Sequence, residues 1–217
     1  PMQIAIVGKS GAGKTSLVNL LPRFYEINNG SILINGEDYR NYKLDELRNN
    51  IAYVFQEPVI FNKTIMDNIK FGNNENISEE EIIKVCRQIG LDKKIMQLPN
   101  GYDTVIDAKS DLLSYGEKQL LSFARAILKN ADVIILDEVT SNLDLEFEES
   151  IMKATKEMLD NKLSFVIAHR LNTIKNSDLI LFIENKKILE MGTHDELINK
   201  HGYYYNLYAS KENVVKI

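Results

Sequence analysis

The stretch "GKSGAGKT" (Gly8–Thr15) decides the fold. It matches G-x-x-x-x-G-K-[ST], and the apolar run "QIAIV" (Gln3–Val7) before it is typical of a buried parallel strand. The segment after it, from Gly13 to about Phe24, is expected to be a helix. Small residues let a backbone wrap around an oxyanion, and the helix N-terminus adds partial positive charge. The stretch therefore predicts a strand–loop–helix unit that holds nucleotide phosphates.

Two side chains of this loop carry specific chemistry. Lys14 places a full positive charge at the β- and γ-phosphates, and the hydroxyl of Thr15 is a ligand for Mg²⁺. A glycine turn without a ligand is the alternative interpretation, and the complete match in strand–loop–helix context argues against it. The predicted phosphate-binding residues are Gly8, Lys9, Ser10, Gly11, Ala12, Gly13, Lys14, Thr15 and Ser16.

A second acidic motif completes this site. The apolar run "VIILD" (Val133–Asp137) predicts a buried strand that ends in a carboxylate, and Asp137 is placed to hold Mg²⁺ through water. Glu138 is the next residue in the sequence. Metal binding alone explains a second carboxylate poorly, whereas a group that orients or deprotonates an attacking water explains it well. On its own "LDE" could be a strand capped by solvated acids, but the phosphate loop favours the catalytic interpretation.

The order of strands and helices predicts an α/β fold. Fully apolar strands that alternate with helices indicate a mostly parallel sheet covered on both faces. The fold class is a P-loop NTPase core with a small antiparallel β portion, whose turn is Asn35-Gly36, and an inserted helical subdomain. We expect a RecA-like core over 1–70 and 131–217. The helical subdomain covers about 71–130, where we find no convincing strand and expect helix from Ile77 to about Leu98 after the N-cap Ser78.

Composition narrows the class of protein. The 217 residues are 44% hydrophobic and carry a net charge of −5, so a globular core is expected and nucleic acid is not the first partner to consider. The lone cysteine, Cys86, allows no intrachain disulfide and fits a reducing compartment, where we interpret it as a small buried side chain. No apolar run approaches the roughly 20 residues of a membrane span.

A second possible anion site lies far from the phosphate loop. The stretch "DLLSYGEKQLLSFARAIL" begins at Asp111 and turns into a helical pattern after Ser114, Tyr115 and Gly116. The N–H groups at such a helix end can face a phosphate. Ser114 could equally be an ordinary N-cap that satisfies only its own helix.

Several further motifs follow one another in a fixed order: Gln56 after a strand, "LSYGEKQ" (Leu113–Gln119), "LDE", "SNLD" (Ser141–Asp144) and "AHR" (Ala168–Arg170). Together they resemble the nucleotide-binding domain of ATP-binding cassette (ABC) transporters, over essentially all of 1–217. The stretch "QEPVIFNKTIMDNIKFG" and the tail "MGTHDELINKHGYYYNLY" look most like the exporter branch.

The resemblance implies the remaining roles. The implied substrate is ATP. The residues implied to hold Mg²⁺ are Thr15, Gln56 and Asp137, and Gln56 is also implied to sense a transmembrane partner. Glu138 polarises the attacking water, and His169 contacts the γ-phosphate. Two domains of this family pack head to tail, so that Ser114 and Gly116 clamp the partner's γ-phosphate while Asp144 lies on the loop that crosses between domains. The implied catalytic residues are then Glu138, His169 and Gln56. The alternative interpretation of His169 is a histidine at the end of a strand that makes only ordinary hydrogen bonds.

Partners and location also come from the resemblance. It implies a second nucleotide-binding domain, identical or different, and a transmembrane domain fused upstream, at the cytoplasmic face of the membrane. We expect the natural chain to continue before Pro1, where the family places an aromatic residue that stacks on adenine, so that the antiparallel β portion is truncated at its N-terminal side. The transported compound is not indicated by this sequence.

The signature departs from the family pattern Leu-Ser-Gly-Gly-Gln at two positions. Tyr115 replaces the first glycine and Glu117 replaces the glutamine, and both changes should weaken a phosphate clamp. Upstream, "IDAKSD" replaces the usual segment with Gly-Glu. Together with the intact Glu138, this favours one half of a heterodimeric exporter. A low-turnover regulatory module is the second hypothesis. A soluble cassette ATPase of the chromosome or DNA-repair type is disfavoured, because roughly 100 residues between loop and signature leave no room for a long coiled coil.

Overall fold

The computed structural model describes residues 1–217 except 74–75, 139–150, 152, 157, 169–170 and 216–217. The chain divides into two compact units. The first comprises residues 1–51, 132–138 and 161–217, and the second comprises 52–131 and 139–160. Two predicted site residues, Asp144 and His169, lie outside the described residues.

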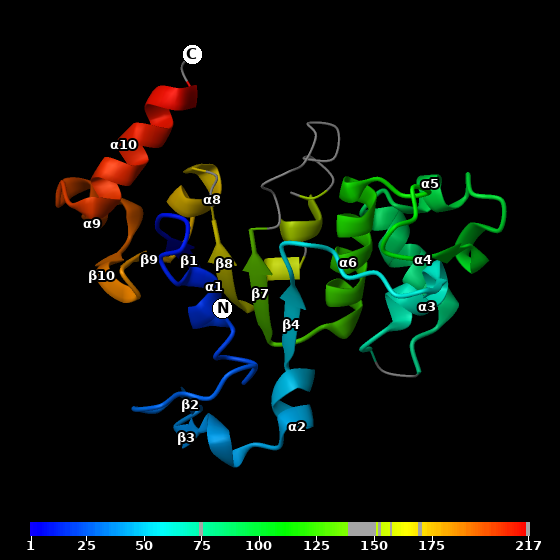
Figure 1. The fold of residues 1–217 in the computed structure, drawn as a ribbon, viewed down its shortest axis with the longest axis horizontal. Coiled ribbons are helices and arrows are strands. Elements are labelled where there is room, and N and C mark those ends of the chain that lie inside the picture. Colours follow the sequence, from blue (N-terminus) through cyan, green and yellow to red (C-terminus); the bar gives the residue numbers. More distant parts are fainter. Residues whose placement is uncertain (74–75, 139–150, 152, 157, 169–170, 216–217) are drawn as a thin grey trace. The chain divides into compact units, whose positions relative to one another are not determined.

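A mostly parallel sheet forms the centre of the first unit (Figure 1), and within this unit its strand order is β10-β9-β1-β8-β7. β8 pairs in parallel with both β1 and β7, β9 pairs in parallel with β1, and β10 pairs antiparallel with β9. This confirms the predicted α/β class. The strands are β1 (Met2–Val7), β7 (Val133–Asp137), β8 (Leu163–Ile167), β9 (Leu179–Glu184) and β10 (Lys187–Gly192).

The sheet positions the site because its central strands are buried and run the same way. Ile6, Val7 and Ile135 have no exposed surface, as expected for parallel strands that are covered on both faces. Since β1 and β7 both run parallel to β8, their carboxyl ends lie at one edge of the sheet. The phosphate loop after β1 and the acids at the end of β7 meet there, where open α/β sheets bind their ligands.

The helix after the phosphate loop is shorter than the sequence predicted. α1 covers only Lys14–Val18, and not the whole of Gly13 to Phe24. Beyond it the N–H groups of Leu20 and Leu21 bond three residues back, to Leu17 and Val18. The turn tightens ahead of Pro22, which has no N–H to continue the helical ladder.

The remaining elements of the first unit are short connections and C-terminal helices. The predicted turn at Asn35-Gly36 is confirmed, with φ of 52° and 87° at its two residues. It joins the antiparallel strands β2 and β3. The elements are β2 (Leu33–Ile34), β3 (Glu37–Asp38), η1 (Tyr39–Asn41), α2 (Leu44–Asn49), α8 (Leu171–Lys175), α9 (His194–Asn199) and α10 (Tyr203–Val215).

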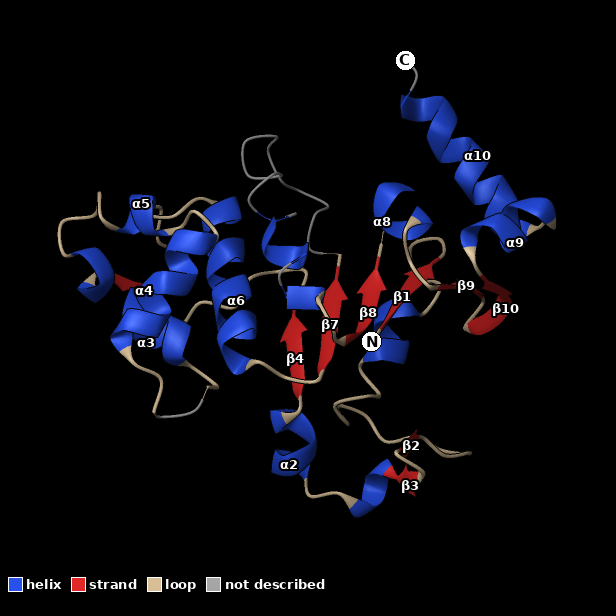
Figure 2. Cartoon of the chain, turned by 180° about the vertical axis from the view of Figure 1, so that it is seen from behind, coloured by secondary structure: helices blue, strands red, loops and turns tan. Residues whose placement is uncertain are grey.

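The second unit is dominated by helices (Figure 2). Both α3 and α4 pack against α6, whose buried face includes Leu120, Phe123 and Ala124. α4 contributes Ile82 and Cys86 to this core, and both are fully buried, as predicted for Cys86. The elements are β4 (Ile51–Val54, which begins at the last residue of the first unit's segment), β5 (Lys63–Thr64), α3 (Ile65–Lys70), α4 (Glu79–Gln88), α5 (Asp92–Ile95), η2 (Gly101–Asp103), β6 (Val105–Ile106) and α6 (Tyr115–Lys129).

Two details of this unit differ from the sequence prediction. The expectation of no strand between 71 and 130 was wrong, because β6 pairs antiparallel with β5. The expected helix from Ile77 to Leu98 is two helices. Gly90 ends the first of them with φ of 81°, the left-handed conformation that commonly terminates helices. The predicted N-cap is confirmed, since Ser78 forms a capping box with Glu81.

Across the described residues, no helix combines the length and the apolar character that crossing a membrane requires.

Candidate functional site

The phosphate loop runs from Gly8 at the end of β1 to Thr15 in the first turn of α1. A Cβ atom added at Gly8 would lie 2.1 Å from the carbonyl oxygen of Ile183 on β9. Gly13, the N-cap of α1, has φ of 103°, a conformation that L side chains rarely adopt. The glycines of the motif are therefore required both by close backbone approach and by backbone conformation.

Lys14 lies inside this loop rather than in solvent. Only 5% of the residue is exposed. Its ammonium donates to the carbonyl oxygens of Gly8 at 3.1 Å and Lys9 at 3.0 Å. It also pairs with Glu138 at 3.7 Å from Nζ to Oε1. A buried charge is costly unless it is paired and hydrogen-bonded, and these contacts hold the ammonium within the loop.

Thr15 and Asp137 meet at the carboxyl edge of the sheet. The Thr15 hydroxyl donates to Oδ1 of Asp137 at 3.2 Å, and only 4% of Asp137 is exposed. Hydroxyl and carboxylate oxygens are the ligands that Mg²⁺ prefers. Among the described residues there is no group of three or more His, Cys, Asp or Glu that could hold a metal ion. The hydroxyl of Thr15 and the carboxylate of Asp137 fit Mg²⁺, which usually takes one or two carboxylates and completes its shell with phosphates and water.

Glu138 follows β7 in an unusual backbone conformation. Its φ is 49°, in the left-handed region that non-glycine residues seldom occupy. Its carboxylate faces the ammonium of Lys14, and the side chain keeps 19% of its surface exposed. Such conformations occur in ordinary turns and also cluster at functional sites. The geometry places a second carboxylate next to the phosphate loop. It lies beside Thr15 and Asp137, whose oxygen atoms are suited to bind Mg²⁺.

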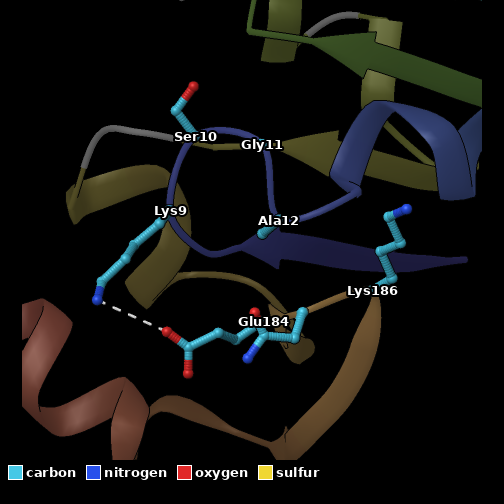
Figure 3. A pocket seen from close by; sticks show the side chains of 7 residues that line it. Lys9, Ser10, Gly11, Ala12, Glu184 and Lys186 are labelled. Carbon is cyan, nitrogen blue, oxygen red and sulfur yellow. Dashed lines mark ion pairs between the residues drawn. The ribbon is translucent and has the colours of Figure 1, made fainter.

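The hairpin turn between β9 and β10 contacts the phosphate loop, which the sequence analysis did not anticipate. Asn185 and Lys186 have φ of 51° and 61°, as in a type I′ turn, and the Lys186 N–H donates to the Ala12 carbonyl at 3.0 Å. The side chain of Lys9 reaches toward Glu184 and pairs with it at 3.6 Å (Figure 3). A hollow of about 410 Å³ is lined by Lys9, Ser10, Gly11, Ala12, Glu184, Asn185 and Lys186. The packing of this turn against the loop depends on contacts between distant segments, which the sequence pattern does not specify.

The other predicted residues that the structure describes lie in the second unit or on the surface of α1. Ser16 is exposed in the first turn of α1. In the second unit, Ser114 is the N-cap of α6, and its hydroxyl accepts from the N–H of Glu117 at 3.3 Å. Gly116 is buried in the first turn of the same helix, and Gln56 follows β4. Ser114 thus caps its own helix, and its contact with a partner's nucleotide stays a prediction.

Glu117 is more restrained than the sequence suggested. Its carboxylate accepts from the Ser114 N–H at 2.7 Å, which completes a capping box, and it pairs with Lys94 at 3.7 Å. Only 9% of the residue is exposed. The negative charge at this helix end is therefore tied to the helix N-terminus and to a lysine.

Comparison with known proteins decides the family. The ABC transporter family matches residues 2–141 of the chain. The chain belongs to this family. It is a nucleotide-binding domain of the exporter type, as the sequence motifs indicated.

Relatives of this ABC domain include both named transporters and solved structures. An ATP-dependent lipid A-core flippase of Methylobacillus flagellatus is 47% identical over 209 residues, which is 96% of this chain and 36% of that protein. An uncharacterized ABC transporter ATP-binding protein of Bacillus subtilis, YfiC, is 43% identical over 96% of this chain and 34% of its own length. A solved bacterial Atm1-family ABC exporter with ATP bound superposes with a TM-score of 0.88 at 36% identity, over 97% of this chain and 36% of that chain. The domain thus spans about a third of the proteins it matches.

The close contact at Gly8 makes a stability prediction. Gly8→Ala should lower the free energy of unfolding by about 1–3 kcal/mol, because its Cβ meets a backbone oxygen of a paired strand and the strand cannot move aside. Gly30→Ala is the control, since it adds the same methyl group at a positive φ with nothing within 4 Å. It should cost only about 1 kcal/mol of backbone strain. Equal losses for the two variants in urea denaturation would contradict the packing argument.

Proposed function

We propose that this domain hydrolyses ATP and that the hydrolysis powers an exporter, to which the domain is joined in its full-length protein. The observation that carries the proposal is the convergence of Lys14, Glu138 and the Thr15–Asp137 pair at the edge of one sheet. These groups are the phosphate-binding cation, the carboxylate for water and the oxygen ligands for a divalent cation. Family membership and the flippase and exporter relatives support the same function.

The loop residues bind and orient the triphosphate in this proposal. The N–H groups of Gly8–Thr15 surround its oxygens. The ammonium of Lys14, held by two loop carbonyls at about 3 Å, exchanges one or more of these partners for β- and γ-phosphate oxygens. Because the lysine is already inside the loop, little reorganisation is needed when nucleotide arrives.

Thr15 and Asp137 would hold Mg²⁺, with Asp137 acting through water, and the family resemblance adds Gln56 to this set. When bound, Mg²⁺ supplies positive charge that offsets the negative charge of the phosphate oxygens. The Thr15 hydroxyl, which now donates to Asp137, would turn its lone pairs to the cation. The Asp137 carboxylate would remain beside it as the acidic end of β7.

Glu138 is the residue that acts on water. Its carboxylate accepts a proton from, or orients, the water that attacks the γ-phosphorus in line. The family resemblance assigns His169 to the γ-phosphate and Asp144 to a loop that crosses to a second nucleotide-binding domain, and both residues lie outside those that the structure describes. The helix end with Ser114 and Gly116 closes on the nucleotide of that second domain. The partners are then this second domain and a transmembrane domain fused upstream, with the ATPase domain at the cytoplasmic face.

Removal of the divalent cation tests this function. The full-length protein, reconstituted in lipid vesicles, should release phosphate from ATP, and excess EDTA should reduce the release to background. Added Mg²⁺ should restore it, because the carboxylate and hydroxyl ligands remain in place. Phosphate release that persists in excess chelator would contradict the proposed site.

A low-turnover half of a heterodimeric transporter is a second candidate. The observation that favours it is Glu117, whose carboxylate occupies the N-terminus of α6 and already accepts the Ser114 N–H. An anion there competes with an incoming γ-phosphate for the same positive helix end. A full-length protein that is a homodimer and turns over ATP at both sites would exclude this candidate.

A further inference from the structure

Tyr115, one of the two residues that depart from the family signature, makes a contact that its position in the motif does not suggest. Its phenol hydroxyl donates to the backbone carbonyl oxygen of Gln56 at 2.6 Å. The two residues are 59 positions apart in the chain and lie in the same compact unit. The residue as a whole is 36% exposed. The tyrosine at the first position of α6 is therefore tethered at the residue proposed to serve Mg²⁺.

A second side chain of the same helix holds the neighbouring carbonyl. Gln119 donates through Nε2 to the carbonyl oxygen of Phe55 at 3.1 Å, and it has no exposed surface. Tyr115 and Gln119 are four residues apart and so lie on one face of the helix. Two successive carbonyls, those of Phe55 and Gln56, are thus held by two successive turns of α6.

A third side chain of α6, that of Arg125, contacts the part of the chain that follows Gln56. The Arg125 guanidinium donates to the carbonyl oxygens of Val59 and Asn68, and it lies over the Phe61 ring at 5.4 Å. Burial lowers the pKa of Arg125 to about 10, so it remains a cation near neutral pH. The segment after β4 is therefore attached to α6 from Phe55 to Asn68, and Tyr115 makes the contact nearest the helix N-terminus.

The phenol hydroxyl is a donor of defined direction, because it lies 2.6 Å from the Gln56 carbonyl oxygen. The tyrosine at this position does more than fill space beside the helix N-terminus, because the hydrogen bond of its hydroxyl fixes the direction of the ring.

We propose that Tyr115 is a positioning residue that couples the N-terminus of α6 to Gln56 through its hydroxyl. The inference rests on the proposed function, in which α6 meets the partner's nucleotide and Gln56 serves Mg²⁺ in the chain's own site. Movement of the helix end is then transmitted to the backbone at Gln56. The glycine that is common in the family at this position has no side chain to make such a bond.

Tyr115→Phe removes the hydroxyl and keeps the ring, so it tests the coupling directly. In nucleotide-free full-length protein, amide hydrogen exchange in residues 55–57 should be roughly three- to tenfold faster, as expected when one hydrogen bond is lost. In steady-state hydrolysis, the Mg²⁺ concentration for half-maximal turnover should rise by a similar factor, while KM for ATP at saturating Mg²⁺ stays within about twofold.

Tyr102→Phe is the matched control. It removes a tyrosine hydroxyl of the same unit, which donates to Asp92 at 2.8 Å and not to the Gln56 segment. It should change neither the amide exchange of residues 55–57 nor the Mg²⁺ dependence of turnover. If the control moves either quantity as much as Tyr115→Phe does, the effect is general loosening and the inference is wrong.

The possible outcomes separate this inference from the proposed function. Unchanged exchange or unchanged Mg²⁺ dependence in Tyr115→Phe overturns the coupling, as does a change confined to KM for ATP, which would assign the phenol to the nucleotide itself. If the wild-type protein releases no phosphate, the proposed function fails. The hydrogen-exchange measurement does not depend on hydrolysis and remains informative in that case. Faster exchange would then support the hydrogen bond between Tyr115 and Gln56, but its coupling to catalysis would be excluded.

Discussion

Glu138→Gln in the full-length protein is expected to lower ATP turnover by about 100- to 10,000-fold, the range that a positioned general base contributes. The amide keeps the size and shape of the carboxylate but cannot accept the proton of water. Glu138 has a strained backbone and a carboxylate aimed at the loop lysine, which a surface acid would not need. Phosphate release under saturating ATP measures the effect.

Nucleotide binding should survive this substitution. Glu138 pairs with Lys14 at 3.7 Å, and the loss of that partner leaves the ammonium with its two carbonyl contacts and available to phosphate. The affinity for ATP, measured by calorimetry, should therefore stay the same or rise. The control is Glu26→Gln, which removes the charge of an exposed carboxylate paired with Arg23 in the same unit. Turnover in Glu138→Gln within about twofold of this control would assign hydrolysis to another base.

The phosphate loop could be predicted from sequence because it depends on local requirements. Glycines at fixed positions, a β-rich run before them and a lysine inside them specify a loop whose backbone conformation is set by residue type. The acids after β7 could also be predicted, because a buried parallel strand delivers its last residues to the same sheet edge. The Asn35-Gly36 turn follows from two residues that tolerate positive φ.

Contacts between distant segments could not be predicted in this way. The N–H of Lys186 that bonds the phosphate loop, and the phenol of Tyr115 that bonds Gln56, depend on how the hairpin and the helix pack. The restraint on Glu117 depends on Lys94, which belongs to another helix. The length of α1 was overestimated because the apolar pattern continues after the helical ladder tightens ahead of Pro22. Periodicity indicates which residues are buried, and backbone hydrogen bonds decide where a helix ends.

Lys14→Met is expected to weaken ATP binding by about 10- to 150-fold, which corresponds to the 1.5–3 kcal/mol of a hydrogen bond to a charged group. The methionine keeps the unbranched side chain but carries no ammonium to meet the β- and γ-phosphates. Calorimetry with ATP and Mg²⁺ on the full-length protein measures the change. Lys187→Met is the control, since it removes the same charge at an exposed position at the start of β10.

Folding should respond much less than binding to the loss of Lys14. The ammonium is buried with its countercharge, and a buried ion pair gives little net stability because desolvation offsets the attraction. The carbonyls of Gly8 and Lys9 lose a donor, whereas the cost of burying the charge disappears. The two effects oppose each other, so the thermal midpoint should shift by a few degrees at most. A large loss of stability with unchanged affinity in the folded fraction would mean that Lys14 holds the loop together and does not bind phosphate.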